Sequence, residues 1–200
     1  VLSPLLANLY LHGLDRHLRE QGYCIVRYAD DFVIACAEEE QARAALQQVQ
    51  AWCEKRELTL HPDKTHIGDC RQAGEGFEFL GYRFEAGRRW VRKKSRDAIR
   101  EKIRAKTGRN RGDSLACIIA DLNPTLKGWY GYFKHAYPME FPAIDGFVRR
   151  RLRAILRRHQ HLDGRLGHSL QDHKRWPNAF FAENGLFTMT EAHALARQPR

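Results

Sequence analysis

The chain has 200 residues, of which 43% are hydrophobic and 29% charged, and this composition supports one ordinary domain or two small ones. No run approaches the roughly 18 apolar residues that a membrane-spanning helix needs, and the first residues carry no leader pattern, so we expect neither a membrane segment nor a signal peptide. Residues 1–87 hold 9 Lys and Arg against 14 Asp and Glu, whereas residues 88–200 hold 25 against 10, which favours a polyanionic partner for the second half.

Three elements are expected in the first 57 residues. Two runs rich in β-branched and aromatic side chains flank Asp30 and Asp31, so residues 23–37 predict a β-hairpin with both acids at its turn. A second helix is expected from Glu38 to Glu57, with acids in its first turn. The helix before the hairpin begins at Ser3-Pro4, ends at Gly22 and has apolar residues at helical spacing: Leu6, Leu9, Tyr10, Leu14 and Leu18.

Asp30 and Asp31 are the candidate metal ligands. Adjacent carboxylates repel each other unless a cation neutralises them, and carboxylate oxygens suit Mg²⁺. Magnesium held in this way supports in-line phosphoryl transfer. An isolated Asp-Asp pair also fits an ordinary solvated turn, so the assignment depends on the rest of the chain.

The stretch up to residue 106 predicts a turn, three strands and a basic helix. Leu58–Ile67 predicts a turn that leads into a strand. Phe77–Phe84 alternates aromatic and polar residues and predicts a half-buried edge strand, in which Gly81 would let backbone approach a ligand. Trp90 and Val91 continue a short strand, and a basic helix follows at about residues 95–106.

The chain beyond residue 112 is expected to be all-helical. Leu126, Trp129, Tyr130 and Phe133 lie three or four residues apart and predict a buried helix face rather than platforms for stacked bases. Residues 147–158 predict another amphipathic helix, apolar on one side and covered by arginines elsewhere. Because the guanidinium fork fits phosphate, this helix is the best candidate for contact with a phosphate backbone.

Several blocks resemble one protein family, in the order in which that family has them. Tyr28-Ala29-Asp30-Asp31 resembles the Tyr-X-Asp-Asp signature of reverse transcriptases, in the form typical of group II intron-encoded proteins. The other similar blocks are Leu2–His12, which precedes the hairpin; His61–Thr65, with His where the family has Asn; Phe77–Tyr82; and Leu122–Phe133, which resembles the maturase-specific domain (domain X).

The resemblance implies an α+β fold, in which a partial reverse-transcriptase palm (an antiparallel sheet with packed helices) is followed by an all-helical thumb/maturase bundle. The expected parts are residues 1–92 for the C-terminal part of the palm, 93–160 for the thumb or domain X, and 161–200 for a tail packed on the thumb. The implied activity is that of an RNA-directed DNA polymerase and maturase that uses Mg²⁺. Its implied partners are group II intron RNA, an RNA template/DNA primer duplex and deoxynucleoside triphosphates, in a bacterial-type cytoplasm and at the nucleoid when it acts on DNA.

The resemblance also implies roles for individual residues. Asp30 and Asp31 would be catalytic and hold Mg²⁺, and Tyr28 and Lys64 would lie near the nucleotide or pyrophosphate, although Lys64 also fits an ordinary surface lysine. Leu80 and Gly81 would form a primer grip. The expected RNA-binding residues are Lys93, Lys94, Arg96, Arg149, Arg150, Arg153 and Arg157.

Two alternatives stay open. An RNA-binding splicing factor would keep the basic thumb and use the palm only as a scaffold, whereas an unrelated basic DNA-binding protein requires the order of the blocks to be coincidence. The family's third catalytic carboxylate belongs to a block that would precede these residues, and there is no initiator methionine. We therefore expect a longer protein, and we expect the 200 residues by themselves to be inactive in polymerisation.

Overall fold

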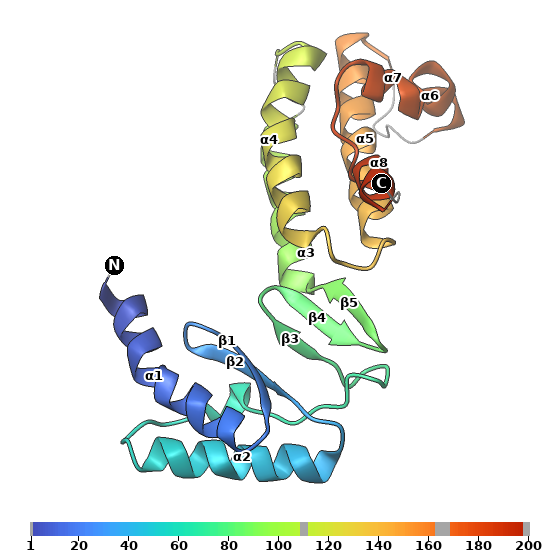
Figure 1. The fold of residues 1–200 in the computed structure, drawn as a ribbon. Helices are drawn as coiled ribbons and strands as arrows, with labels where there is room; N and C mark the ends of the chain where they lie inside the picture. Colours follow the sequence, from blue (N-terminus) through green and yellow to red (C-terminus); the bar gives the residue numbers. More distant parts are fainter. Residues whose placement is uncertain (1, 109–111, 163–168, 198–200) are drawn as a thin grey trace. The chain divides into compact units, whose positions relative to one another are not determined.

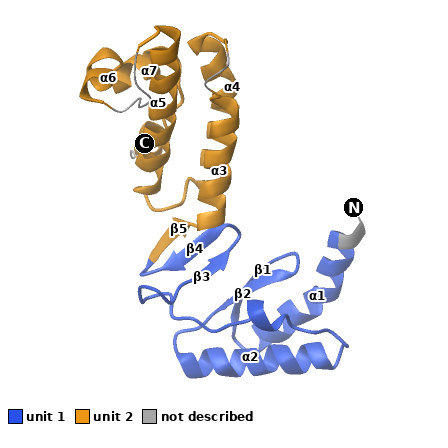
Figure 2. Cartoon of the chain, turned by 180° about the vertical axis from the view of Figure 1, so that it is seen from behind, with its two compact units in different colours: residues 1–87 blue, residues 88–200 orange. Residues whose placement is uncertain are grey.

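The structure, a computed structural model, describes residues 2–108, 112–162 and 169–197. The chain forms two compact units, residues 1–87 and 88–200 (Figure 2). Small antiparallel sheets and helices together confirm the α+β class expected from the sequence. The three-part division with boundaries after residues 92 and 160 stays a prediction. Within the described ranges, no helix is long and apolar enough to cross a membrane.

The first unit contains a hairpin with two helices packed on one of its faces (Figure 1). The predicted hairpin is confirmed: β1 (Cys24–Tyr28) pairs with β2 (Asp31–Ala35) in antiparallel register. Helix α1 (Leu2–Glu20) precedes it and α2 (Glu39–Glu54) follows it, in good agreement with the two predicted helices. Their shared core contains Leu14, Leu18, Ile25, Val49, Trp52 and Cys53.

Only the second half of the apolar stripe predicted for α1 is buried. Leu14 and Leu18 are fully buried, but the apolar residues nearer the start of the helix remain exposed, with Leu9 at 75%. The exposed set also includes Leu5, Leu6 and Tyr10. Helical spacing identified the apolar stripe correctly, but among the described residues the hairpin and α2 cover only the second half of it.

Two strand predictions in this unit are wrong. After the short 3-10 helix η1 (Pro62–Lys64), residues 65–67 form no strand. Residues 77–84 are not one strand but a tight hairpin of β3 (Phe77–Phe79) and β4 (Tyr82–Glu85), in which Phe79 pairs with Tyr82. The two turn residues, Leu80 and Gly81, have φ of 49° and 79°, and positive φ at both central positions is typical of two-residue hairpin turns.

The second unit is mainly helical, as predicted. It begins with β5 (Arg88–Val91) and α3 (Lys93–Lys106), and continues with α4 (Leu115–Phe133) and α5 (Glu140–His159). The short helices α6 (Leu170–Arg175), α7 (Asn178–Glu183) and α8 (Met189–Ala196) follow. The predicted apolar side of the helix at residues 147–158 is confirmed, because Val148, Leu152, Ile155 and Leu156 are all buried. The core also contains Ile99, Ile103, Ile118, Leu122, Leu126, Phe141 and Ile144.

Polar side chains attach the C-terminal segment to α4 and α5. The Asn123 amide donates to the Gly185 carbonyl oxygen at 2.8 Å and accepts from the Phe187 amide at 2.8 Å. Asp145 on α5 accepts hydrogen bonds from the backbone N–H groups of Met189 and Thr190, at 3.1 and 2.9 Å, and so satisfies the first donors of α8. Residues 163–168 and 198–200 of the predicted tail lie outside the described residues.

Candidate functional site

The turn of the β1–β2 hairpin presents the two candidate carboxylates. Ala29 and Asp30 form the turn, and Asp31 is the first residue of β2, paired with Tyr28 at the end of β1. Ala29 has a φ of 55°, a conformation that costs a residue with a Cβ roughly 1–2 kcal/mol. The tight turn places Asp30 and Asp31 at the tip of the hairpin.

Strand alternation separates the two faces of the hairpin. Ile25 and Arg27 face the helices, whereas Val26 and Tyr28, which are 56% and 68% exposed, face outward. Asp31 lies opposite Tyr28 and therefore belongs to the outward face. Both Asp30 and Asp31 are exposed. Within the described ranges, no hydrogen bond or ion pair engages either carboxylate, so their oxygens are available to a ligand.

Arg27 ties this turn to α1. Its Nε and Nη2 donate to the two carboxylate oxygens of Asp15, at 2.9 and 2.7 Å, and its Nη1 donates to the Asn8 Oδ1 at 2.8 Å. The same Nη1 donates to the Ala29 carbonyl oxygen at 2.7 Å. The Arg27 and Asp15 side chains are only 10% and 9% exposed. One guanidinium therefore fixes the backbone at the turn residue immediately before Asp30.

The bidentate Arg27–Asp15 pair shifts the pKa of both partners. Hydrogen bonding from Arg27, together with its positive charge, lowers the pKa of Asp15 below the ordinary value of 3.8, although burial opposes the change. Hydrogen bonding to Asp15 correspondingly raises the pKa of Arg27. Both groups are thus held in their charged forms at neutral pH.

We expect the stabilisation that the Arg27–Asp15 pair gives the fold to be lost in acid. A carboxyl group whose pKa is lower in the folded state stabilises the fold above its unfolded pKa, and that stabilisation is lost as the pH falls through the folded value. Asp15→Asn is therefore expected to destabilise the first unit by about 2 kcal/mol at pH 7, because a nearly buried Arg27 loses its charged partner. The difference from the unchanged chain should shrink below pH 3.8, measured by urea unfolding. Equal stability of the two chains at pH 7 would contradict this role.

The carboxylates at the hairpin tip fit a magnesium ion chemically. Mg²⁺ is commonly bound by one or two carboxylates, with water and substrate phosphates completing the octahedron. Asp30 and Asp31 supply that donor set. In the part of the chain that the structure describes, no group of three or more His, Cys, Asp or Glu side chains is arranged to hold a metal. An ion held by these two carboxylates would need further ligands, such as water or substrate phosphates, to complete its coordination.

The residues predicted to lie beside the pyrophosphate and the primer belong to elements other than the β1–β2 hairpin. Lys64 is the exposed last residue of η1, and across the described ranges no ion pair joins it to Asp30 or Asp31. Leu80 and Gly81 form the turn of the β3–β4 hairpin and are half-buried. Their roles beside a nucleotide and a primer stay predictions.

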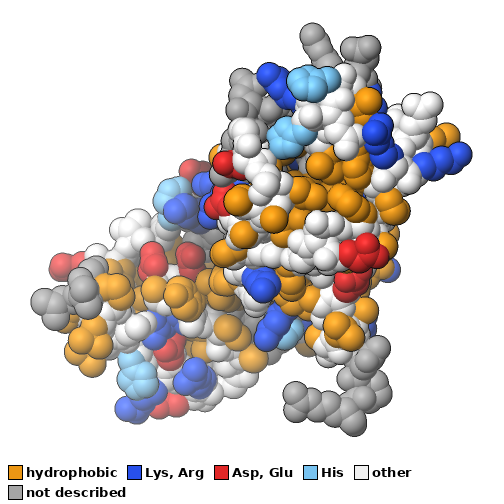
Figure 3. All heavy atoms as spheres, turned by 90° about the horizontal axis from the view of Figure 1, so that it is seen from above, with side chains coloured by type: hydrophobic (Ala, Val, Ile, Leu, Met, Phe, Trp, Pro, Cys, Tyr) orange, Lys and Arg blue, Asp and Glu red, His pale blue; other side chains and the backbone are white. Residues whose placement is uncertain are grey.

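The predicted RNA-binding residues fall into two groups. Lys93 and Lys94 are exposed at the start of α3, and Arg150 is exposed on α5. Arg149 is half-buried, and Arg96 donates to the Glu140 Oε1 at 3.3 Å while its side chain stays 38% exposed. Where Figure 3 shows the molecular surface, Lys and Arg side chains are scattered among hydrophobic ones rather than gathered in one patch.

Arg153 and Arg157 were predicted to lie on the arginine-covered outer side of the helix at residues 147–158, but both are engaged inside the second unit. Arg153 is only 2% exposed. Its Nε donates to the Trp176 carbonyl oxygen and its Nη2 to the Asn178 Oδ1, both at 2.9 Å, and its guanidinium lies 5.2 Å from the centre of the Phe181 ring. Burial, followed by repulsion from Arg149, lowers its pKa.

Arg157 is also held within the unit. Its Nη1 donates to the Asp172 Oδ1 at 2.7 Å, and the two side chains are 15% and 2% exposed. Burial alone would raise the pKa of Asp172, but hydrogen bonds from Arg157 and Ser169 outweigh that effect and lower it. Arg153 and Arg157 therefore attach α6 and α7 to α5, and their RNA-binding roles stay predictions.

The residues that support the hairpin tip were not predicted from the sequence. Arg27 precedes Tyr28-Ala29-Asp30-Asp31 directly, and its inward position follows from strand alternation. The partner Asp15 lies one helical turn before Leu18 on the covered side of α1, and a lone acid among core positions is the available signal for a buried ion pair. Pairing the two required the packing of α1 against β1.

Two family models match this chain. Residues 1–84 match the family described as reverse transcriptase (RNA-dependent DNA polymerase), and residues 96–176 match the group II intron, maturase-specific domain. The first match contains the hairpin with Asp30 and Asp31, and the second contains α4 and α5. No curated protein matched the sequence.

Proposed function

This chain belongs to the family of group II intron-encoded reverse transcriptases and maturases, and from that premise we propose that it takes part in RNA-directed DNA synthesis at the β1–β2 hairpin. The observation that carries the proposal is the state of Asp30 and Asp31. Two neighbouring carboxylates are exposed at a tight turn, and no cation of the described chain neutralises them.

Each residue at the hairpin has a part in the proposed reaction. Asp30 and Asp31 would hold Mg²⁺, which when bound lowers the charge on the reacting phosphates and aligns them. The primer 3′-oxygen would then bond to the α-phosphorus of a deoxynucleoside triphosphate while the bond to pyrophosphate breaks and the hydroxyl proton leaves to solvent. Tyr28, exposed beside Asp31, would contact the nucleotide, and Lys64 would neutralise part of the departing pyrophosphate.

The second unit would hold the RNA. Its excess of basic residues favours polyanion binding, and the proposed contacts are the exposed Lys93, Lys94 and Arg150 with the half-buried Arg149. Such contacts reach the backbone rather than base edges, as expected for structured RNA. The proposed ligands are group II intron RNA and the RNA template/DNA primer duplex. The activity would place the protein in the cytoplasm, at the nucleoid when it acts on DNA.

Primer extension tests this function. The encoded protein should extend a DNA primer on an RNA template when deoxynucleoside triphosphates and Mg²⁺ are present, and EDTA should stop the reaction. RNA binding without any extension would overturn the polymerase proposal and favour a splicing factor whose palm is only a scaffold. A signal that persists in EDTA would contradict the metal-dependent chemistry.

A further inference from the structure

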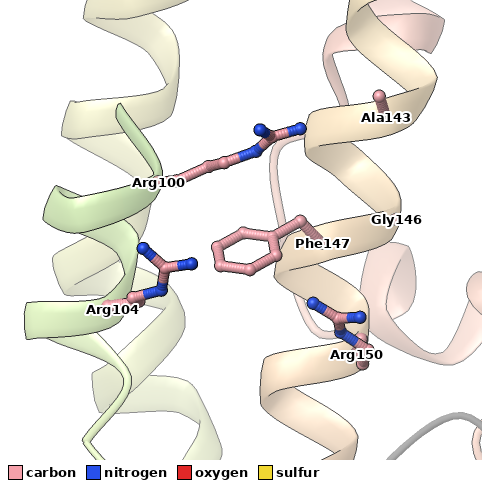
Figure 4. Close-up of a pocket in the computed structure, with 6 residues that line it drawn as sticks. All are labelled: Arg100, Arg104, Ala143, Gly146, Phe147 and Arg150. Carbon is pink, nitrogen blue, oxygen red and sulfur yellow. The ribbon is translucent and has the colours of Figure 1, made fainter. Parts of the chain in front are cut away.

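A cavity of about 400 Å³ lies between α3 and α5 of the second unit (Figure 4). Arg100 and Arg104 border it from α3, one helical turn apart. The α5 side is formed by Ala143, Gly146, Phe147 and Arg150, whose spacing places them on one face of that helix. The sequence indicated Arg150 for RNA binding, but neither Arg100 nor Arg104. The packing of the two helices is what brings the three guanidinium groups to one cavity.

The Phe147 ring orders two of these arginines. The guanidinium of Arg104 lies 5.5 Å from the ring centre and that of Arg150 lies 5.4 Å from it, within the range of cation–π attraction. In Figure 4 the ring projects from α5 toward α3, among the three guanidinium groups. Because arginines engage the ring, we do not expect it to stack on a base. One N–H donor of Arg104 bonds to Glu101, and the other guanidinium N–H groups of Arg104 and Arg150 remain available to an anion.

The cavity has an excess of positive charge. Arg100 pairs with Asp97 at 3.8 Å and Arg104 pairs with Glu101, but both acids are exposed residues of α3 that do not line the cavity. Arg150 has no acidic partner among residues 2–108, 112–162 and 169–197. Like charges gathered around one space repel each other, so an anion bound between them would relieve that repulsion.

We propose that this cavity binds a phosphodiester group of RNA, an inference that rests on the proposed function of the second unit and assigns it one specific site. Guanidinium forks match phosphate oxygens in pairs. The volume lies in the range of pockets that hold small organic ligands, so it accommodates the attached ribose as well as the phosphate. A Cβ added at Gly146 would meet nothing within 4 Å, which leaves space for that sugar. Such a site recognises backbone and carries no base specificity.

A cavity-filling substitution tests the site without removing any charge. Gly146→Leu should place a side chain in the open space of the cavity, and Gly128→Leu on α4 is the matched control, because a Cβ at Gly128 also meets nothing within 4 Å. Gly146→Leu should weaken binding of a single-stranded RNA oligonucleotide roughly tenfold at 0.1 M salt. It should also flatten the log–log salt slope by about 0.7 to 0.9, because one phosphate would no longer be neutralised. The control should bind RNA as the unchanged chain does.

The arginines can also be observed directly. Phenylglyoxal modifies accessible guanidinium groups, and mass spectrometry should find Arg100, Arg104 and Arg150 protected by the RNA oligonucleotide. The exposed Arg158 serves as the reference. Protection by inorganic phosphate but not by RNA would overturn the assignment and indicate a site for a small free anion.

The outcomes separate this inference from the proposed function. If the unchanged chain binds RNA but Gly146→Leu, with an unchanged circular dichroism spectrum, binds equally well, the cavity site is wrong and the general RNA-binding role stands. If the unchanged chain does not bind RNA at all, both are wrong. If both Gly→Leu chains lose binding equally, the effect is not local to the cavity and the site is likewise rejected.

Discussion

An Asp30→Asn substitution in the encoded protein is expected to lower kcat for primer extension by about 10³-fold or more. Asn keeps the size of the side chain but removes the charge that would hold Mg²⁺. A bound metal stabilises the transition state of phosphoryl transfer by several kcal/mol, and about 4 kcal/mol corresponds to a thousandfold change in rate. Because Asp30 is exposed and engages no partner in the described chain, the stability of the fold should hardly change.

Iron-mediated cleavage of the backbone identifies the metal as the cause. Fe²⁺ substituted for Mg²⁺ should cleave the backbone near residue 30 when peroxide is added, Mg²⁺ should compete, and Asp30→Asn should abolish the cleavage. Asp69→Asn is the control, since it makes the same chemical change at a carboxylate that binds Arg71 in an exposed loop. A full rate of extension by Asp30→Asn would show that the hairpin tip is not the catalytic centre.

Replacing Arg153 by Ala is expected to destabilise the second unit by about 4 kcal/mol, measured by urea unfolding. The substitution empties a fully buried position. It also removes the donors to the Trp176 carbonyl oxygen and the Asn178 amide oxygen, and unsatisfied buried acceptors are costly. Arg153→Met keeps most of the volume and should cost roughly half as much, because it removes only the hydrogen bonds and the packing of the guanidinium on Phe181.

Measurements of RNA affinity distinguish the structural role of Arg153 from the RNA-binding role predicted from the sequence. Under conditions where Arg153→Met remains folded, its affinity for RNA should stay within about twofold of the unchanged chain. Arg158→Ala, at an exposed position of the same helix, should change stability by no more than about 0.5 kcal/mol. A large loss of RNA affinity in Arg153→Met without a loss of stability would return Arg153 to the RNA-facing surface.

Local sequence patterns predicted secondary structure correctly where that structure depends on residues close together in the chain. The hairpin around Asp30 and Asp31 follows from two β-prone runs on either side of a short turn, and the comparison with known families confirms the family suggested by Tyr28-Ala29-Asp30-Asp31. The helices of the second unit were equally predictable, because apolar spacing of three and four residues is a property of each segment alone. The Phe77–Phe84 hairpin was missed because positive φ at a non-glycine residue, Leu80, has no compositional signal.

The sequence by itself determined the class of fold, the family, the position of the paired acids at a turn and the apolar side of the helix at residues 147–158. Only the tertiary structure decided which polar residues are enclosed. Arg153 is covered by the segment that contains α6 and α7. Arg27 donates hydrogen bonds to Asp15 and to the backbone of the turn before Asp30. Helical and strand periods indicate which side chains share a face. They do not indicate which distant segment covers that face, and for a charged side chain this decides between a structural contact and a surface open to RNA.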